Sequence, residues 1–171
     1  MNFKNLKISL IIAILFSLAT GSVQAQSVRL LGDYKDWSAY ATSQGANKLC
    51  FTLSKPKDIS PKPDDYTQAY LYITHRPNDN IRNEINIVAG FEFAKNSNAT
   101  IKIGGQLYEL FISGDSAWLD DTSKTDELVG QMRAGSTLSI SGLTASGVKV
   151  TQVYSLSGVT AASRAINREC I

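Results

Sequence analysis

The chain has 171 residues, of which 43% are hydrophobic and 19% are charged, a length and composition that suit one globular domain. It carries 17 Lys and Arg against 15 Asp and Glu, but Lys4 and Lys7 lie in the first 25 residues, so residues 26–171 carry 15 of each and are neutral. A neutral chain without basic clusters argues against nucleic acid or an anionic membrane as its main partner.

The N-terminus has the pattern of a secretory signal peptide. Lys4 and Lys7 precede an apolar run at residues 8–19, which is too short to anchor stably in a bilayer. Val23-Gln24-Ala25 is a small-residue cleavage site, so the predicted cut follows Ala25. An uncleaved membrane anchor is the alternative interpretation. We therefore expect residues 1–25 to be a signal peptide and residues 26–171 to be a single exported domain with no membrane span.

Short segments of alternating polarity dominate the rest of the chain and predict β-strands. In residues 48–53, Leu49, Phe51 and Leu53 face one way while Cys50 faces the other. The polar, proline-rich residues 55–65 predict a surface loop. The remaining predicted strands are residues 69–74, 84–93, 99–103, 106–112, 136–140 and 148–156.

The clearest hairpin connects residues 99–103 to residues 106–112. Gly104-Gly105 tolerates the positive φ angles that a two-residue hairpin turn requires. Counting back from this turn places Ile101 opposite Tyr108 on the same face.

Two helices interrupt the strands. The first is expected after residue 123, because Ser123 and Asp126 have the spacing of a capping box and Gly135 suits a C-terminal cap. The second is expected at residues 157–170, with Ser157 as its N-cap.

The second helix carries an apolar stripe that ends in a cysteine. Val159, Ala162, Ile166 and Cys170 recur at spacings that place them on one side of a helix. Because export permits disulfides and the chain has two cysteines, a Cys50–Cys170 bridge is expected to hold this helix on the sheet. Two free thiols and an intermolecular link are the alternatives.

These elements predict a mainly β fold. We expect an antiparallel β sandwich or flattened barrel of about seven to nine strands, with two short helices of which one is C-terminal.

The chain contains few candidates for catalysis. His75 is the single histidine, and it is a candidate general base or, alternatively, a packed or surface histidine. The pairs Asp64-Asp65 and Asp120-Asp121 are candidates for acid–base chemistry or, more simply, for turns and helix starts. No C-x-x-C or H-x-x-x-H spacing occurs, so we expect no metal centre, no cofactor and no catalytic residue.

The two tryptophans are the stronger candidates for a functional surface. Trp37 follows Gly32-Asp33, taken as a turn, and Trp118 precedes the acidic start of the first helix. Aromatic side chains in such positions supply binding area at a small entropic cost. The alternative is that both cover the end of the β core.

Several short motifs follow one another in a recognisable order over residues 32–170. In chain order they are Gly32-Asp33 with Trp37; Leu49-Cys50 and Pro56; Tyr72-Ile73-Thr74-His75-Arg76-Pro77; Glu84 to Gly90 and Phe93; Tyr108-Glu109-Leu110-Phe111; Ala117-Trp118; Gly135-Ser136; and Tyr154-Ser155-Leu156-Ser157-Gly158 with Ala161-Ala162 and Cys170. This order resembles the invasion-associated locus B family of Gram-negative envelope proteins. Family members often read Gly-Asp-Trp at the first motif, where this chain reads Gly32-Asp33-Tyr34-Lys35-Asp36-Trp37.

The resemblance implies an exported, mostly β protein that lies in the periplasm or outer envelope or is secreted, and one branch of the family is associated with host-cell invasion. The resulting hypothesis is a non-enzymatic envelope protein that acts by binding a protein or small-ligand partner. A periplasmic hydrolase-like enzyme that uses His75 or a carboxylate pair, and a carrier that holds a small apolar ligand, are the alternatives.

Overall fold

The computed structural model describes residues 27–45 and 47–171, so the predicted signal peptide and its cleavage site lie outside the described residues. Within these ranges, eleven strands form one sheet in which all pairings are antiparallel. The strands are β1 (Ser27–Tyr34), β2 (Trp37–Gln44), β3 (Asn47–Ser54), β4 (Asp58–Ser60), β5 (Tyr70–Arg76), β6 (Ile81–Val88), β7 (Ala99–Ile103), β8 (Gln106–Ser113), β9 (Ser116–Leu119), β10 (Thr137–Leu143) and β11 (Lys149–Ser155).

Four helical segments accompany the strands of the described chain. They are the 3₁₀ turns η1 (Pro77–Asp79) and η2 (Thr122–Lys124) and the α-helices α2 (Thr125–Ala134) and α3 (Val159–Cys170). Among the described residues, no helix has the length and apolar character needed to span a bilayer.

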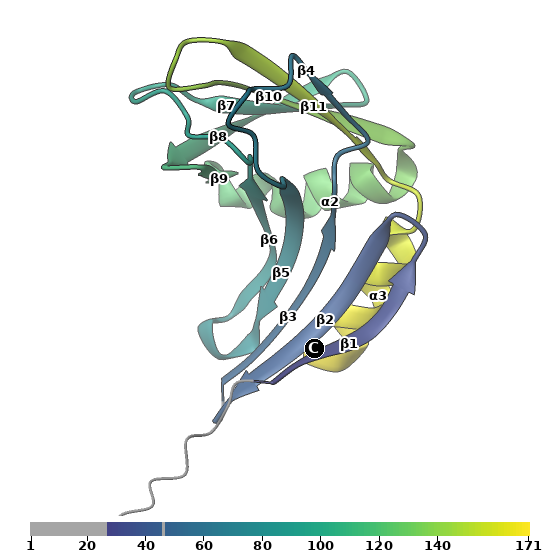
Figure 1. Ribbon diagram of the computed structural model, residues 1–171. Coiled ribbons are helices and arrows are strands. Elements are labelled where there is room, and N and C mark those ends of the chain that lie inside the picture. Colours follow the sequence, from purple (N-terminus) through teal and green to yellow (C-terminus); the bar gives the residue numbers. More distant parts are fainter. Residues whose placement is uncertain (1–26, 46) are drawn as a thin grey trace, which may run out of the picture.

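The sheet is strongly curved and does not close. Its strand order is β1-β2-β3-β5-β6-β9-β8-β7-β10-β11-β4, which leaves β1 and β4 at the two edges. Figure 1 shows β1, β2, β3, β5 and β6 in the lower part of the sheet and β7, β10 and β11 in the upper part. The bend brings the inner faces of the two parts together.

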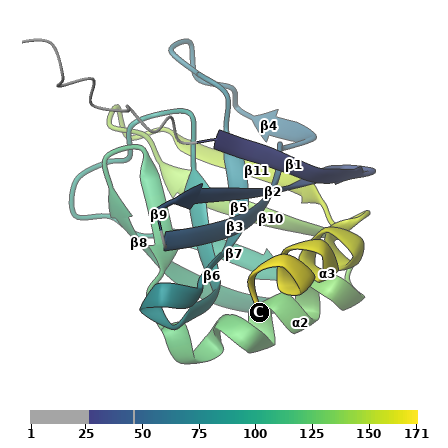
Figure 2. The same cartoon turned by 90° about the horizontal axis from the view of Figure 1, so that it is seen from below.

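One apolar core fills the inside of this bend. Leu71 and Ile73 of β5, Ile101 of β7 and Tyr154 of β11 are fully buried in the same cluster. Helices α2 and α3 contact each other along this inner side, where Figure 2 shows them as neighbours. Burial of large apolar side chains from both parts of the sheet stabilises the bent shape over a flat one.

The predicted fold class is confirmed: the protein is mainly antiparallel β with two α-helices, one of them C-terminal. The hairpin prediction is also confirmed, because Ile103 pairs with Gln106 across Gly104-Gly105 and Ile101 pairs with Tyr108. The expected strand number was wrong, since the described residues contain eleven strands and not seven to nine.

Four strands of the described chain were not predicted from the sequence. They are β1, β2, β4 and β9. β4 lies inside the predicted surface loop and pairs with β11, and Gly32-Asp33 belongs to β1 rather than to a turn. The real turn is Lys35-Asp36, because Tyr34 pairs with Trp37. Tertiary pairing therefore supplied the strand character that the local pattern lacked.

The strand expected at residues 84–93 is displaced toward the N-terminus. It begins at Ile81 and ends at Val88. Beyond Val88 the backbone forms hydrogen bonds with loop residues and not with a strand. Ala89 N donates to Asp115 O, and Gly90 O accepts from Thr67 N. Phe93 retains only an isolated bridge to Thr144.

Both predicted N-caps were wrong. Asp121 caps η2 by accepting a hydrogen bond from Ser123 N, and α2 then begins at Thr125 without a side-chain cap. The N-cap of α3 is Gly158 and not Ser157. Gly158 adopts φ 102°, and a Cβ atom built there would lie 1.7 Å from Tyr34 O, so the chain requires glycine at this close approach. Gly135 does cap the end of α2, as predicted.

The C-terminal helix is attached as the sequence predicts. Val159, Ala162, Ile166 and Cys170 are all buried. Cys50 and Cys170 form a disulfide with a Cα–Cα distance of 6.0 Å across 120 residues of sequence. The stripe and the bridge together hold α3 against the inner face of β1, β2, β3 and β5.

Candidate binding cleft

A cleft opens where β6 and β9 diverge. β9 pairs with β6 only through Asn86, Ile87 and Val88. At Leu119, β9 follows β8 instead, by pairing with Leu110. In the described part of the chain, residues 81–85 of β6 therefore have β5 as their single strand neighbour, and we call this segment the β6 margin. In Figure 1, β9 lies beside only the upper part of β6.

The cleft has a volume of about 750 Å³, within the range of roughly 300–1,000 Å³ that small-molecule and peptide-sized sites occupy. Its first wall is the β6 margin. Its second wall comes from β8 and β9, through Phe111, Trp118 and Leu119. Thr122 and Thr125, at the start of the helical segment, lie at its end.

An aromatic pair forms the second wall. Phe111 of β8 and Trp118 of β9 are cross-strand neighbours whose rings stack with centroids 5.4 Å apart and planes 16° apart. Phe111 is 46% exposed, and Trp118 is half-buried. An exposed stacked pair of this kind supplies apolar area for a partner without prior rearrangement.

The polar groups of the cleft are unevenly paired. Arg76 makes a two-point contact with Glu84, at 2.5 Å and 3.2 Å, and also lies 3.3 Å from Asp79. Arg82 is exposed and forms no salt bridge within residues 27–45 and 47–171. The cleft therefore offers one cation whose charge is not already compensated.

His75 is a packed residue and not an exposed base. It is 1% exposed, and both ring nitrogens are occupied: Nδ1 accepts from Asn83 N at 3.0 Å, and Nε2 lies 2.6 Å from Asn167 Oδ1. Because Nδ1 accepts, Nε2 carries the proton and donates to Asn167. Burial lowers the pKa of His75, the Asn167 contact acts in the opposite direction, and Arg82 and Arg133 lower it further.

The two carboxylate pairs lie in separate places. Asp64 and Asp65 are exposed in the loop between β4 and β5. The carboxyl of Asp121 accepts hydrogen bonds from the hydroxyl and from the backbone N–H of Ser123. These bonds hold the pKa of the Asp121 carboxyl below its usual value. Asp120 N donates to Glu109 O at the end of β9. Asp121 therefore has the capping role that the simpler interpretation proposed.

Comparison with known protein families gives one match. The model of the family described as Invasion associated locus B (IalB) protein matches residues 37–167, most of the chain. The chain belongs to the IalB family. Comparisons with curated proteins and with solved structures found no match.

Both tryptophans lie within the residues that the IalB model matches, but their surroundings differ. Trp37 lies at the first matched position, yet it is 1% exposed and donates from Nε1 to Ser155 O at 2.9 Å. The prediction that Trp37 belongs to an interaction surface was therefore wrong, because β2 turns this side chain into the core. Trp118 lines the cleft, and its part in an interaction surface stays a prediction.

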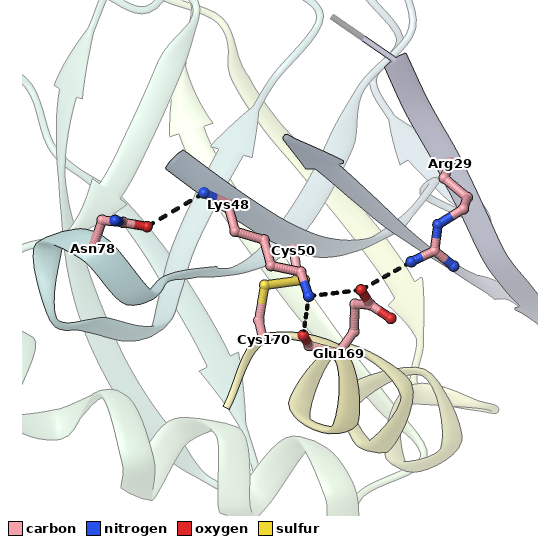
Figure 3. Close-up of polar contacts among 6 residues, drawn as sticks. All are labelled: Arg29, Lys48, Cys50, Asn78, Glu169 and Cys170. Atoms are coloured by element: carbon pink, nitrogen blue, oxygen red, sulfur yellow. Dashed lines mark hydrogen bonds and ion pairs between the residues drawn. A yellow bond between two sulfur atoms is a disulfide. The ribbon is translucent and has the colours of Figure 1, made fainter. Parts of the chain in front are cut away.

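A second feature of the IalB chain surrounds its C-terminus. The carboxylate of Glu169 forms ion pairs with Arg29, at 2.9 Å, and with Lys48, at 2.7 Å. Both ion pairs lie next to the Cys50–Cys170 bridge (Figure 3). The hydrogen bonds from Lys48 and Arg29 hold the pKa of Glu169 below its usual value. Cys170 lies beyond the matched residues, whereas Cys50 lies within them. This cluster fastens the end of α3 to β1 and β3.

Sequence reasoning did not identify Phe111, Arg76 and Arg82 as residues of a site. Phe111 faces Trp118 only because β9 pairs with β8, and β9 itself was not predicted. The signal available in the sequence was the exposed aromatic residue inside the predicted strand at 106–112.

Proposed function

We propose that this protein is an exported, non-enzymatic binding protein of the bacterial envelope, and that it holds a protein partner in the cleft between β6 and β9. The observation that carries the proposal is the exposed Phe111–Trp118 pair beside the uncompensated Arg82. Aromatic and arginine side chains are the residue types that most often dominate binding energy at protein interfaces.

The chemistry around His75 favours binding over catalysis. A general base needs a ring nitrogen within reach of substrate, and the His75 nitrogens already bond Asn83 and Asn167. Neither asparagine is an acid that would orient the ring for proton transfer. A binding role requires neither a general base nor an acid that orients it.

Export is supported by the signal-peptide pattern of residues 1–25 and by the disulfide, which suits an oxidising compartment. The periplasm or the outer envelope is the proposed location, and the partner is either another envelope protein or, as the family name suggests, a protein of an invaded host cell. Mass spectrometry of the envelope fraction should find Gln26 as the first residue. A cytosolic species that still carries Met1 would contradict export.

The binding proposal is tested by photo-crosslinking in living cells. A benzophenone amino acid replaces Phe111, and, as the matched control, Leu107, which is exposed on the same strand. We expect a discrete crosslinked protein product from position 111 that position 107 does not give, and its loss when Arg82→Glu is added. Equal products from positions 111 and 107 would contradict the proposal. Absence of a product at position 111, both in the bacteria alone and in contact with host cells, would also contradict it.

A further inference from the structure

The β6 margin presents backbone that has a strand neighbour on one side only. Its sequence, Ile81-Arg82-Asn83-Glu84-Ile85, contains no proline, so every residue keeps its N–H and C=O groups. On the β5 side, Glu84 pairs with Thr74 and Ile81 pairs with Arg76. Asn83 departs from regular strand geometry, because its φ is 58° and its N–H donates to His75 Nδ1. In an antiparallel sheet the groups of the other residues that do not bond β5 point toward the next strand position, which β9 occupies only from Asn86 onward.

The cleft has room for a chain at that position. It lies alongside the β6 margin and is bounded on its other side by Phe111, Trp118 and Leu119. An extended peptide laid there would continue the line of β9 and would run antiparallel to β6. Alternate side chains of such a peptide would face the aromatic wall, since side chains in a strand alternate between two faces.

Charge defines one more property of the occupant. Arg76 is compensated by Glu84 and Asp79, whereas Arg82 has no salt bridge in the part of the chain that the structure describes. A carboxylate is the group that pairs best with a free guanidinium. The occupant should therefore carry an acidic side chain near Arg82.

We propose that the cleft binds an extended peptide segment by strand addition to the β6 margin, with alternate apolar side chains against Phe111 and Trp118 and an acidic side chain on Arg82. This inference rests on the proposed binding function and names the class of its partner. Strand addition of this kind draws affinity from main-chain hydrogen bonds and specificity from alternate side chains.

A glycan fits the same surface less well. Sugar rings bind to aromatic faces, but Phe111 and Trp118 stack with planes 16° apart, so each ring turns one face toward the other. The backbone N–H and C=O groups of a strand also repeat at the spacing of an extended peptide, which a glycan does not have.

The test uses peptides selected on the mature protein. A random nine-residue peptide library is displayed on phage and selected against residues 26–171, with Arg82→Glu as the counter-selected variant and Lys102→Glu as a charge-reversal control. Lys102 is exposed on β7 and does not line the cleft. Circular dichroism checks that both variants are folded. The best peptide is then synthesised with a single N-methyl group at each backbone position in turn.

We expect selected peptides with alternating apolar residues and at least one acidic residue. Their affinity should fall by about tenfold or more in Arg82→Glu and remain unchanged in Lys102→Glu. N-methylation should weaken binding by about tenfold at every second position and have little effect at the positions between, because only alternate residues bond to one neighbouring strand. Amide hydrogen exchange should slow in residues 81–85 when the peptide binds.

Three results would overturn the inference: no enriched peptide, an N-methyl scan without a period of two, or exchange protection that lies elsewhere. These results are separable from failure of the binding function. A crosslinked product at position 111 together with any of them would keep the cleft as a binding site and reject strand addition. Absence of that product would reject the binding function itself.

Discussion

Asn167 of α3 reaches across 92 residues of sequence to place its Oδ1 atom 2.6 Å from Nε2 of His75 on β5. The ring thereby acts as a link between the C-terminal helix and the sheet, and the bond from Asn83 N to Nδ1 fixes its tautomer. A histidine held in this way is neutral, and its protonation state is coupled to folding.

The protein should lose stability on mild acidification because of His75. Its pKa is lowered in the folded protein from the ordinary value of 6.5, so below pH 6.5 the unfolded chain binds a proton more readily than the folded one. The contribution is fully present above pH 6.5 and falls as the pH drops toward the folded pKa. Urea unfolding at pH 7.5 and 5.5 measures the loss, which should shrink in His75→Gln.

Two variants of Asn167 distinguish the effect of its hydrogen bond on stability from the effect of the charge on His75. Asn167→Ala leaves a buried imidazole N–H without a partner and should cost about 1–3 kcal/mol at pH 7.5. Asn167→Asp places a carboxylate beside the ring, raises the pKa of His75 and should reduce the stability lost between pH 7.5 and 5.5. An unchanged pH dependence in Asn167→Asp would contradict this account.

Removal of the disulfide should destabilise the protein by about 2–5 kcal/mol, since the bridge constrains a loop of 120 residues in the unfolded chain. Cys50→Ser and Cys170→Ser should have similar effects, and the double variant should be no less stable than either, because each change removes the same bond. Hydrogen exchange should show α3 opening first. Peptide mapping without reduction identifies the bridge, and labelling of both thiols by an alkylating agent before reduction would refute it.

Gly158 should tolerate no side chain. Gly158→Ala should cost at least about 3 kcal/mol, because its Cβ would lie 1.7 Å from Tyr34 O. Gly147→Ala is the matched control: its φ is +82° and nothing lies within 4 Å of the added Cβ, so it should cost only about 1–2 kcal/mol of backbone strain. Chemical denaturation of the two variants compares them. Equal losses of unfolding free energy in the two variants would mean that the backbone at Tyr34 moves away from the added Cβ at no cost.

Replacement by alanine should affect mainly stability at Trp37 and mainly binding at Trp118. Trp37→Ala removes a buried ring and its bond to Ser155 O, and should cost about 3–5 kcal/mol. Trp118→Ala removes mainly the stacking on Phe111, worth about 0.5–1.5 kcal/mol, and leaves a folded protein that has lost its crosslinked product at position 111. Thermal unfolding and the crosslinking assay distinguish the two effects.

Several features could be predicted from local sequence pattern. The hairpin at Gly104-Gly105, the stripe of α3 and the pairing of Cys50 with Cys170 all follow from spacing of 2 or about 3.6 residues, or from a count of two cysteines. The order of its motifs also indicated the IalB family, which the match to residues 37–167 confirms.

The directions of the tryptophan side chains and the set of residues that meet at the cleft depend on strand pairing across the whole sheet. Trp37 is buried because β2 pairs with β1 and β3, which turns this side chain into the core. The cleft exists because β9 leaves β6 at Leu119 to follow β8, which brings Phe111 and Trp118 opposite Arg82. Pairings between strands distant in sequence depend on the burial of the whole sheet, so no local pattern contains them.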